Sequence, residues 1–373
     1  MPDDVPLGRF EFRRQFPALR IVEAAGIALS PASVLIATVA SVLLSVSGWV
    51  VDRAVPIEER VPVVGMVSER WPIQIGGIPL IGSVANEILM RPWLSVVQPA
   101  VSFMNPPAGL NSRWNAMLRF ALALCLWSLV GSILCRRSAM LFVGNDESTV
   151  RRGIDYGLRR WRASASGPLI PLASALLIGL MIAAIGLVGR LPGLGFIVFW
   201  IALPVVIIMG FTMAFLLLAT AFGWPLMMAA VSTDDCDGFG ALSRAYSGLS
   251  GRPWHAMGYA SIGTLVGVVL MAVVHLIAET TIWCAMSGTA LGSGEEWAYE
   301  SIQVILTPVV HALVSGVGIS FFWSTAVVIY LLLRLDVDGV PLDRIAVDDD
   351  ARPVRDPLPV VGIPATDART GID

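Results

Sequence analysis

Residues 191–233 read LPGLGFIVFWIALPVVIIMGFTMAFLLLATAFGWPLMMAAVST, and none of them carries a charge. A helix needs about 20 apolar residues to cross the hydrocarbon of a bilayer, so this stretch is long enough for one span or for two. We prefer one tilted helix, kinked near Pro204 and ended by Trp224 and Pro225. Two helices would invert every later segment and would place the Glu-containing loop 285–301 inside the cell.

The whole composition agrees with this stretch, since 56% of the residues are hydrophobic and only 14% are charged, with a mean hydropathy of +0.75. An ordinary soluble domain has about 25% charged residues. The chain is therefore expected to be an all-α integral membrane protein with six transmembrane helices. The expected spans are 28–51, 114–135, 168–189, 195–222, 256–284 and 303–333.

Arginine counts predict the orientation of these spans, because positively charged loops resist translocation. The loop between the second and third spans contains seven Arg within residues 136–162, whereas the loop 285–301 contains none. Four Arg precede the first span, and five follow the last. We therefore expect a multi-pass protein of a bacterial inner (cytoplasmic) membrane with both termini in the cytoplasm.

The spans fall into three pairs, and each pair is preceded by a segment of Arg and aromatic residues at or near helical spacing, namely 9–21, 145–162 and 234–253. This order predicts three helix-hairpin units, each introduced by a cytoplasmic interfacial helix. Such helices bind anionic lipid head groups or dock a cytoplasmic protein, and both roles stay open. The expected contacts to lipid head groups are Arg151, Arg152, Arg159, Arg160, Arg162 and Trp161.

Two further segments lie outside the spans of the membrane domain 1–335. Residues 52–113 are too long for a simple connection and predict an extracytoplasmic insertion. It contains a small hairpin around Gly76 and Gly77, then a helix from about Pro92 that lies on the outer surface or is re-entrant. The insertion is either a lid or a surface cap. The acidic, Pro-rich tail 336–373 is expected to be disordered or loosely attached.

Three ionisable residues in the last two spans are the candidate intramembrane polar or ion site: His275, Glu279 and His311. His275 and Glu279 are one helical turn apart, and His311 lies at a similar depth on the next span. The alternatives are a hydrogen-bonded cluster joining two helices, a proton or ion site, or a catalytic metal site. Gly263 and Gly267 form a small-xxx-small pair that favours close helix packing within the chain.

The passage from Pro225 through Asp234 to Trp254 resembles a pattern of uncharacterised bacterial polytopic membrane proteins. It is also distantly similar to the membrane domain found beside some glycerophosphodiester phosphodiesterases. The residues that carry the likeness are Pro225, Asp234, Phe239, Ala241, Leu242, Ser243, Tyr246, Arg252, Pro253 and Trp254. The soluble phosphodiesterase domain has no counterpart in this sequence, so the resemblance implies a membrane fold and no catalytic residue.

No phosphate-binding loop, nucleophile elbow or paired-Cys motif occurs in the sequence, and we expect no resident cofactor or metal and no nucleic-acid partner. The leading hypothesis is a non-catalytic scaffold or partner subunit in contact with anionic lipid, with a protein partner that the sequence does not identify. The alternative is a transporter or channel component that uses His275, Glu279 and His311. An intramembrane enzyme is the third hypothesis.

Overall fold

The computed structural model describes residues 17–56, 89–104, 109–144, 150–191, 194–293 and 296–346, and every regular element within these ranges is helical. The elements are η1 (Pro17–Val22), α2 (Glu23–Ala28), α3 (Pro31–Ala54), α7 (Arg91–Met104), α8 (Leu110–Phe142), α9 (Val150–Val188), α10 (Leu194–Asp234), α11 (Gly238–Gly251), α12 (Pro253–Ser293) and α13 (Glu296–Asp338).

Within the described ranges, six helices are long and apolar enough to cross a membrane: α3, α8, α9, α10, α12 and α13. Each of them overlaps one predicted span. The chain is therefore a multi-pass integral membrane protein. The helices are longer than the spans, since α10 and α12 have 41 residues each. At 1.5 Å per residue this is ~60 Å, about twice the thickness of the hydrocarbon.

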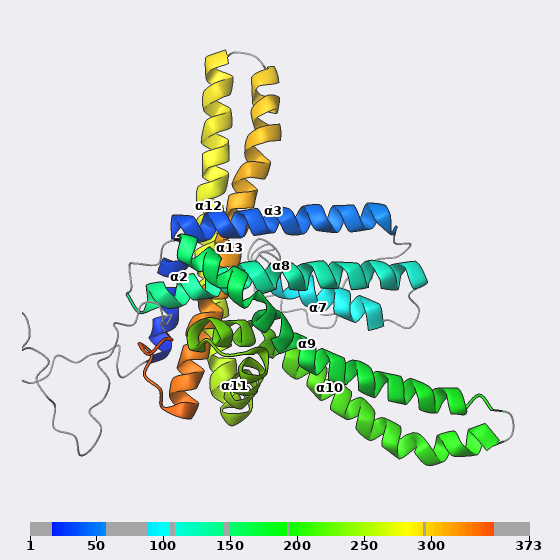
Figure 1. The fold of residues 1–373 in the computed structure, drawn as a ribbon. Coiled ribbons are helices and arrows are strands. Elements are labelled where there is room, and N and C mark those ends of the chain that lie inside the picture. The colour runs from blue at the N-terminus through cyan, green and yellow to red at the C-terminus, as the bar shows by residue number, and fades with distance from the viewer. Residues whose placement is uncertain are drawn as a thin grey trace, which may run out of the picture.

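The long helices form three arms that diverge from a common hub (Figure 1). The first arm contains α3 and α8 with α7 alongside, the second contains α9 and α10, and the third contains α12 and α13. The inner ends of the arms meet α2 and α11 in the hub. Connections alternate along the chain between the hub and the arm tips, as expected of a chain that crosses a bilayer repeatedly.

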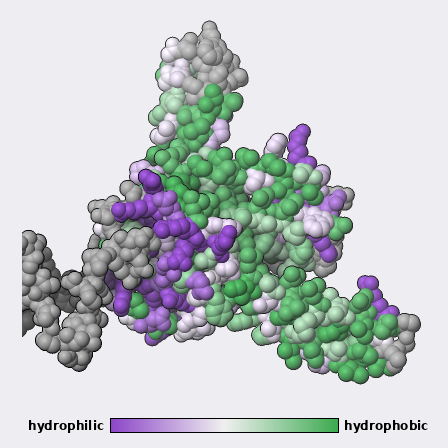
Figure 2. Space-filling view, viewed as in Figure 1, coloured by the Kyte–Doolittle hydropathy of each residue, from purple (hydrophilic) through white to green (hydrophobic). Residues whose placement is uncertain are grey.

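Hydropathy divides the surface in the same way (Figure 2). Hydrophilic residues gather over the part of the hub where α11 and the end of α13 lie, and the arms are largely hydrophobic. Exposed large apolar side chains occur on all three arms, for example Val39, Ile208 and Leu276. A surface of this kind suits hydrocarbon on the arms and an aqueous boundary at the hub.

At the centre of the hub, each arm contributes one fully buried tryptophan from its second long helix: Trp127 of α8, Trp224 of α10 and Trp323 of α13. The ring centroids of Trp127 and Trp323 are 5.8 Å apart, and those of Trp224 and Trp323 are 5.4 Å apart. Such aromatic pairs add roughly 0.5–1.5 kcal/mol each beyond area burial. The three arms are thus joined by one aromatic cluster.

The glycine pair on α12 packs within the chain, as predicted. A Cβ at Gly263 would lie 2.7 Å from the side chain of Thr325, and one at Gly267 would lie 2.6 Å from the ring of Phe321. Both neighbours belong to α13. The absence of side chains at these two positions therefore permits the close approach of the two helices in the third arm.

The stretch without charges forms one helix, α10, and the preferred single-helix interpretation is confirmed. Its predicted end at Trp224 and Pro225 is wrong, because α10 continues to Asp234. Pro225 has no N–H for the carbonyl of Ala221, which would ordinarily end or kink the helix. The indole N–H of Trp93 donates to that carbonyl instead, at 2.7 Å. The backbone group that Pro225 leaves without a partner is thus satisfied from α7.

The helix α7 lies along α8, and its first turns reach into the hub. Besides the bond from Trp93 to α10, the hydroxyl of Ser95 accepts a hydrogen bond from the indole of Trp127 at 2.7 Å. The first turns of α7 thus contact the hub, and whether the helix is re-entrant or lies on the outer surface stays a prediction. The predicted hairpin at Gly76 and Gly77 lies outside the described residues.

The predicted interfacial helices differ from unit to unit. In the third unit α11 is a separate helix, which Asp237 caps by accepting from the Gly240 N–H at 2.9 Å. In the second unit no separate helix exists, because α9 runs unbroken through residues 150–188. The helix continues through Pro168 and Pro171. In the first unit the described part consists of the short helices η1 and α2.

The first part of the predicted tail is ordered by the hub, which corrects the expectation for residues 336–346. The Ala346 N–H donates to the carbonyl of Thr233 at 2.8 Å, and the hydroxyl of Tyr259 donates to Asp336 at 2.8 Å. The guanidinium of Arg334 donates to the Arg344 carbonyl at 2.6 Å. Backbone and carboxylate acceptors hold this segment although it has little apolar periodicity. The rest of the tail lies outside the described residues.

We predict that the indole of Trp93 stabilises the protein only while Pro225 is present. Trp93→Phe keeps an aromatic ring but removes the N–H, and should lower the free energy of unfolding by about 1–2 kcal/mol. In a Pro225→Ala background the alanine provides a backbone N–H for the Ala221 carbonyl, so the same change should cost less than half as much. Denaturant titration in mixed micelles measures both. Equal losses in the two backgrounds would contradict this account.

Candidate functional site

A nearly enclosed carboxylate, Asp234, lies at the inner end of α10 and joins three helices. It forms ion pairs with Arg334 of α13 and Arg244 of α11, and the hydroxyl of Tyr330 donates to it at 2.5 Å. The side chains of Asp234 and Arg334 are each 7% exposed, whereas that of Arg244 is 47% exposed. One negative charge thus faces two positive charges, and its carboxylate oxygens accept three hydrogen bonds.

The next residue, Asp235, joins α10 to α9. Its carboxylate pairs with Arg160 and accepts a hydrogen bond from the hydroxyl of Tyr156 at 3.2 Å. The same hydroxyl donates to the Val231 carbonyl at 2.7 Å. The backbone of Asp235 has a φ of 52°, a conformation that Asp and Asn adopt more readily than most residues. The turn lets two successive carboxylates serve two different helices.

Arg136, at the inner end of α8, completes this polar layer. Its guanidinium donates to the carbonyls of Ser232 and Ala346 at 2.9 and 2.8 Å, and lies 4.7 Å from the ring centre of Tyr156. We call Arg136, Tyr156, Arg160, Asp234, Asp235, Arg244, Tyr330 and Arg334 the polar layer. It ties together residues from α8, α9, α10, α11 and α13.

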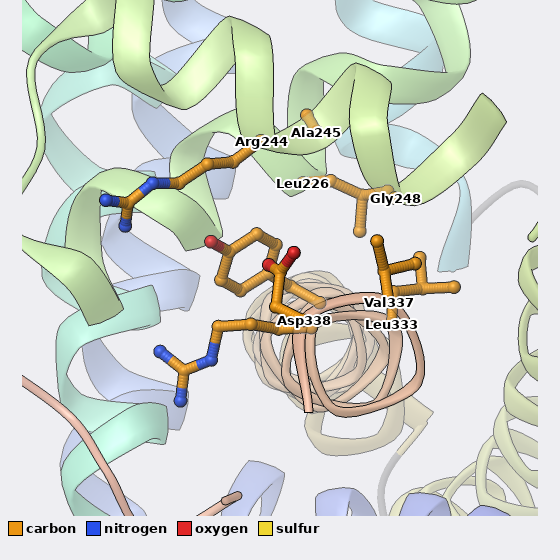
Figure 3. Close-up of a pocket in the computed structure, with 9 residues that line it drawn as sticks. Leu226, Arg244, Ala245, Gly248, Leu333, Val337 and Asp338 are labelled. Carbon is orange, nitrogen blue, oxygen red and sulfur yellow. The ribbon is translucent and has the colours of Figure 1, made fainter. Parts of the chain in front are cut away.

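A small pocket opens beside this layer (Figure 3). Arg244 lies on one side of it, and the apolar side chains of Leu333 and Val337 lie on the other. Its volume of about 10 Å³ is at the threshold for one water molecule. The Nε of Arg334, which also lines the pocket, is buried without a hydrogen-bond partner. The pocket suits a structural water and has no room for a metabolite.

Two ionisable side chains near the connection after α10, Cys236 and Arg244, have pKa values shifted upward, which favours their protonated forms. Burial raises the pKa of the Cys236 thiol to about 11, so the thiol stays protonated at neutral pH. Burial on its own acts to lower the pKa of Arg244, but the charge and hydrogen bond of Asp234 raise it by more. A protonated thiol is a weak nucleophile. The Cys236 thiol beside the layer is therefore poorly suited to nucleophilic chemistry, and the ion pairs of the layer hold helices together.

The predicted intramembrane residues meet in part. The Nε2 of His311 lies 3.1 Å from a carboxylate oxygen of Glu279, which joins α13 to α12. His275 instead places its Nδ1 2.8 Å from the Met271 carbonyl of its own helix. Within the described part of the chain, no three His, Cys, Asp or Glu residues are placed to hold a metal ion. The ion site stays a prediction, now centred on one carboxylate and imidazole pair.

Among the predicted lipid contacts, Arg160 is committed to Asp235 and is half-buried. Arg151, Arg152, Arg159 and Arg162 are exposed along the inner half of α9, and so is Trp161. The guanidinium of Arg162 lies 5.7 Å from the ring centre of Trp161. Contact of these five residues with lipid head groups stays a prediction.

Sequence reasoning does not identify the polar layer as a unit. Asp234 and Asp235 follow the apolar run directly, and their pattern alone indicates the start of an interfacial helix. Arg334 ends another apolar run and by itself bears only on orientation. A possible signal is an acidic and a basic residue that each end a long span on the same side of the membrane. Which acid pairs with which base can be identified only from the fold.

No family model matches this chain, and no curated protein or solved structure matches it either. The likeness to the membrane domain beside glycerophosphodiester phosphodiesterases therefore stays a prediction. Function must be inferred from the geometry alone.

We predict a large difference between two neighbouring substitutions in the polar layer. Asp234→Asn leaves the buried guanidinium of Arg334 without a counter-charge, which should lower the free energy of unfolding by about 3–5 kcal/mol. Asp235→Asn is the matched control, because its ion pair is about one-third exposed and Asn tolerates the positive φ. Its cost should stay under about 1 kcal/mol. Denaturant titration of both variants in micelles measures the two losses of unfolding free energy. Similar losses would refute the central role of Asp234.

Proposed function

We propose that this chain is a non-catalytic scaffold or partner subunit of a bacterial inner membrane. The observation that carries the proposal is a polar pair on an apolar arm. The side chains of Glu279 and His311 are 62% and 45% exposed, in the middle of the third arm. Exposed apolar residues flank them, including Leu276 at 69% and Ile277 at 60%.

An ionised side chain costs roughly 2.5–3.5 kcal/mol at the centre of a membrane helix on insertion scales. Lipid chains offer Glu279 no hydrogen bond to offset that cost. A second membrane protein that brings a hydrogen-bond donor against the pair would remove it. The chemistry of the expected partner is therefore a membrane helix with a hydroxyl, amide or basic side chain within an apolar face.

Photo-crosslinking tests this proposal. A photoreactive residue replacing Leu276 should form an adduct with one other membrane protein in native membranes, and that adduct should fall several-fold when Glu279→Leu is added. Ile208, 66% exposed on the second arm, is the control position and should not give the same adduct. An adduct of twice the chain's own mass would indicate self-association and would overturn the partner-subunit assignment.

The alternative is a transporter or channel component, and the contact between Glu279 and His311 is the observation that favours it. A carboxylate and an imidazole in hydrogen-bond contact can pass a proton from one to the other. Proteoliposomes discriminate the two functions. If the purified protein conducts protons and Glu279→Gln abolishes the flux, the scaffold proposal fails. We expect no flux above that of empty liposomes.

The proposal includes an orientation in which the hub faces the cytoplasm and contacts anionic lipid through α9. Arginine distribution supports this orientation, because the Arg-rich connections meet at the hub while the tip after α12 carries no Arg. The polar layer and the hydrophilic surface of Figure 2 lie at the same end of the arms.

Cysteine labelling tests the orientation. In a cysteine-free background, Gly292→Cys at the tip of the third arm should react with a membrane-impermeant maleimide from the periplasmic side. Ser247→Cys on the exposed face of α11 should react only after the inner membrane is disrupted. Labelling in the opposite order would invert the orientation.

A further inference from the structure

Arg91, the first residue of α7, extends between two arms, and its hydrogen-bond partners among the described residues are all hydroxyl groups. Its Nη1 donates to Ser41 of α3 at 2.9 Å and to Ser315 of α13 at 3.4 Å. Its Nη2 donates to Ser45 of α3 at 2.7 Å. Hydroxyls are neutral acceptors, so they orient the guanidinium but supply no counter-charge.

Two other arginines inside the protein have carboxylate partners. In the same arm, Arg119 lies 2.5 Å from the carboxylate of Asp52, and in the hub Arg334 pairs with Asp234. For Arg91, the described residues provide no such partner. A buried or half-buried charge in apolar surroundings is costly unless a counter-charge is present. Among the described residues Arg91 therefore has no counter-charge, which leaves its guanidinium available to an anion from outside them.

The geometry leaves donors available for that anion. A guanidinium has five N–H groups, and the three serine contacts use three of them. The Nε–H and one N–H of Nη2 remain, and Nε and Nη2 together form the edge by which a guanidinium binds carboxylate or phosphate in a bidentate manner. Arg91 as a whole is half-buried, so part of the residue reaches the surface of the described structure.

The surroundings favour an anion with an apolar body. Ser315 and Arg334 are nineteen residues apart on α13, about 28 Å along the helix at 1.5 Å per residue. Arg91 is therefore far from the polar layer and close to apolar surface. On α3 the side chains next to Ser41 and Ser45 are large, apolar and about half-exposed: Val42 at 48%, Leu43 at 50% and Val46 at 50%. An acyl chain lying on α3 would cover them.

We propose that Arg91, with Ser41, Ser45 and Ser315, binds the phosphate of a phospholipid whose acyl chains lie along α3. The guanidinium supplies charge and two hydrogen bonds, and the serine hydroxyls hold its plane between α3 and α13. A free phosphate ion shares the chemistry of the head group, but it would leave the apolar surface of α3 unused. The site shares α13 with the Glu279 and His311 pair, since Ser315 lies one helical turn after His311.

The test uses the full chain, delipidated in detergent and titrated with phosphatidylglycerol, with bound lipid counted by native mass spectrometry. Arg91→Gln should weaken binding of the tightest lipid roughly 10- to 100-fold, since a charge-assisted hydrogen bond contributes about 1.5–3 kcal/mol. Arg91→Lys keeps the charge without the bidentate edge and should lie between wild type and Arg91→Gln. Ser45→Ala should weaken binding a few-fold. Size-exclusion chromatography and circular dichroism check that each variant is folded.

Arg53→Gln is the matched control, because Arg53 is an exposed residue of the same arm whose loss changes the net charge equally. It should leave the tightest lipid bound as in wild type. The proposal is overturned if Arg91→Gln retains that lipid, or if Arg53→Gln loses it equally. Displacement of the lipid from wild type by millimolar inorganic phosphate would show a free-phosphate site and would overturn the assignment to a phospholipid.

Discussion

The enclosed carboxylate of Asp234 is the interaction on which the arrangement of the arms depends. It closes the charge-free run that forms α10, and it receives Arg334 and Tyr330 from α13 and Arg244 from α11. Two arms and the intervening helix thus meet at one group that is 7% exposed. Burying this charge is tolerable only because its oxygens accept from three side chains. The inner ends of α10, α11 and α13 are fixed by that requirement, and the arms diverge from there.

For α10 to extend as far as Asp234, the helix must continue through Pro225. In a lipid environment this requires a new hydrogen-bond donor for the carbonyl that the proline leaves unpaired. Water is absent from hydrocarbon, so a carbonyl that loses its helical N–H must find another donor within the protein. Trp93 provides it for Ala221, and this bond also anchors the start of α7 in the hub. From there α7 projects Arg91 toward Ser41 and Ser315. One tertiary hydrogen bond therefore links the length of α10 to the position of the proposed lipid site.

The spans could be predicted from the sequence because a charged residue within hydrocarbon is costly wherever it occurs. Each span therefore appears in the sequence as a long run with few charges. The end of α10 could not be predicted, since Pro225 is a helix breaker by itself and its remedy comes from Trp93, 132 positions earlier. Asp234 and Arg334 were visible as charges at span ends, but their pairing depends on how α10 and α13 approach. The contact of Glu279 with His311 could be expected, because the two residues lie at similar depths on adjacent spans. His275 instead bonds the carbonyl of Met271, one turn earlier on its own helix, and its sequence pattern does not distinguish that contact from one with Glu279 or His311.

The contrast between α13 and α10 bears on the choice between scaffold and transporter. In the most apolar stretch of α13, 89% of the residues are buried, whereas in that of α10 none is. The helix α13 is thus surrounded by other helices of the protein, whereas α10 exposes its apolar side chains to the surroundings. A solute path needs protein walls on all sides across the hydrocarbon. Diverging arms provide broad apolar faces in place of such walls, and the described pocket holds at most one water. These features support the proposed scaffold over the alternative of a transporter.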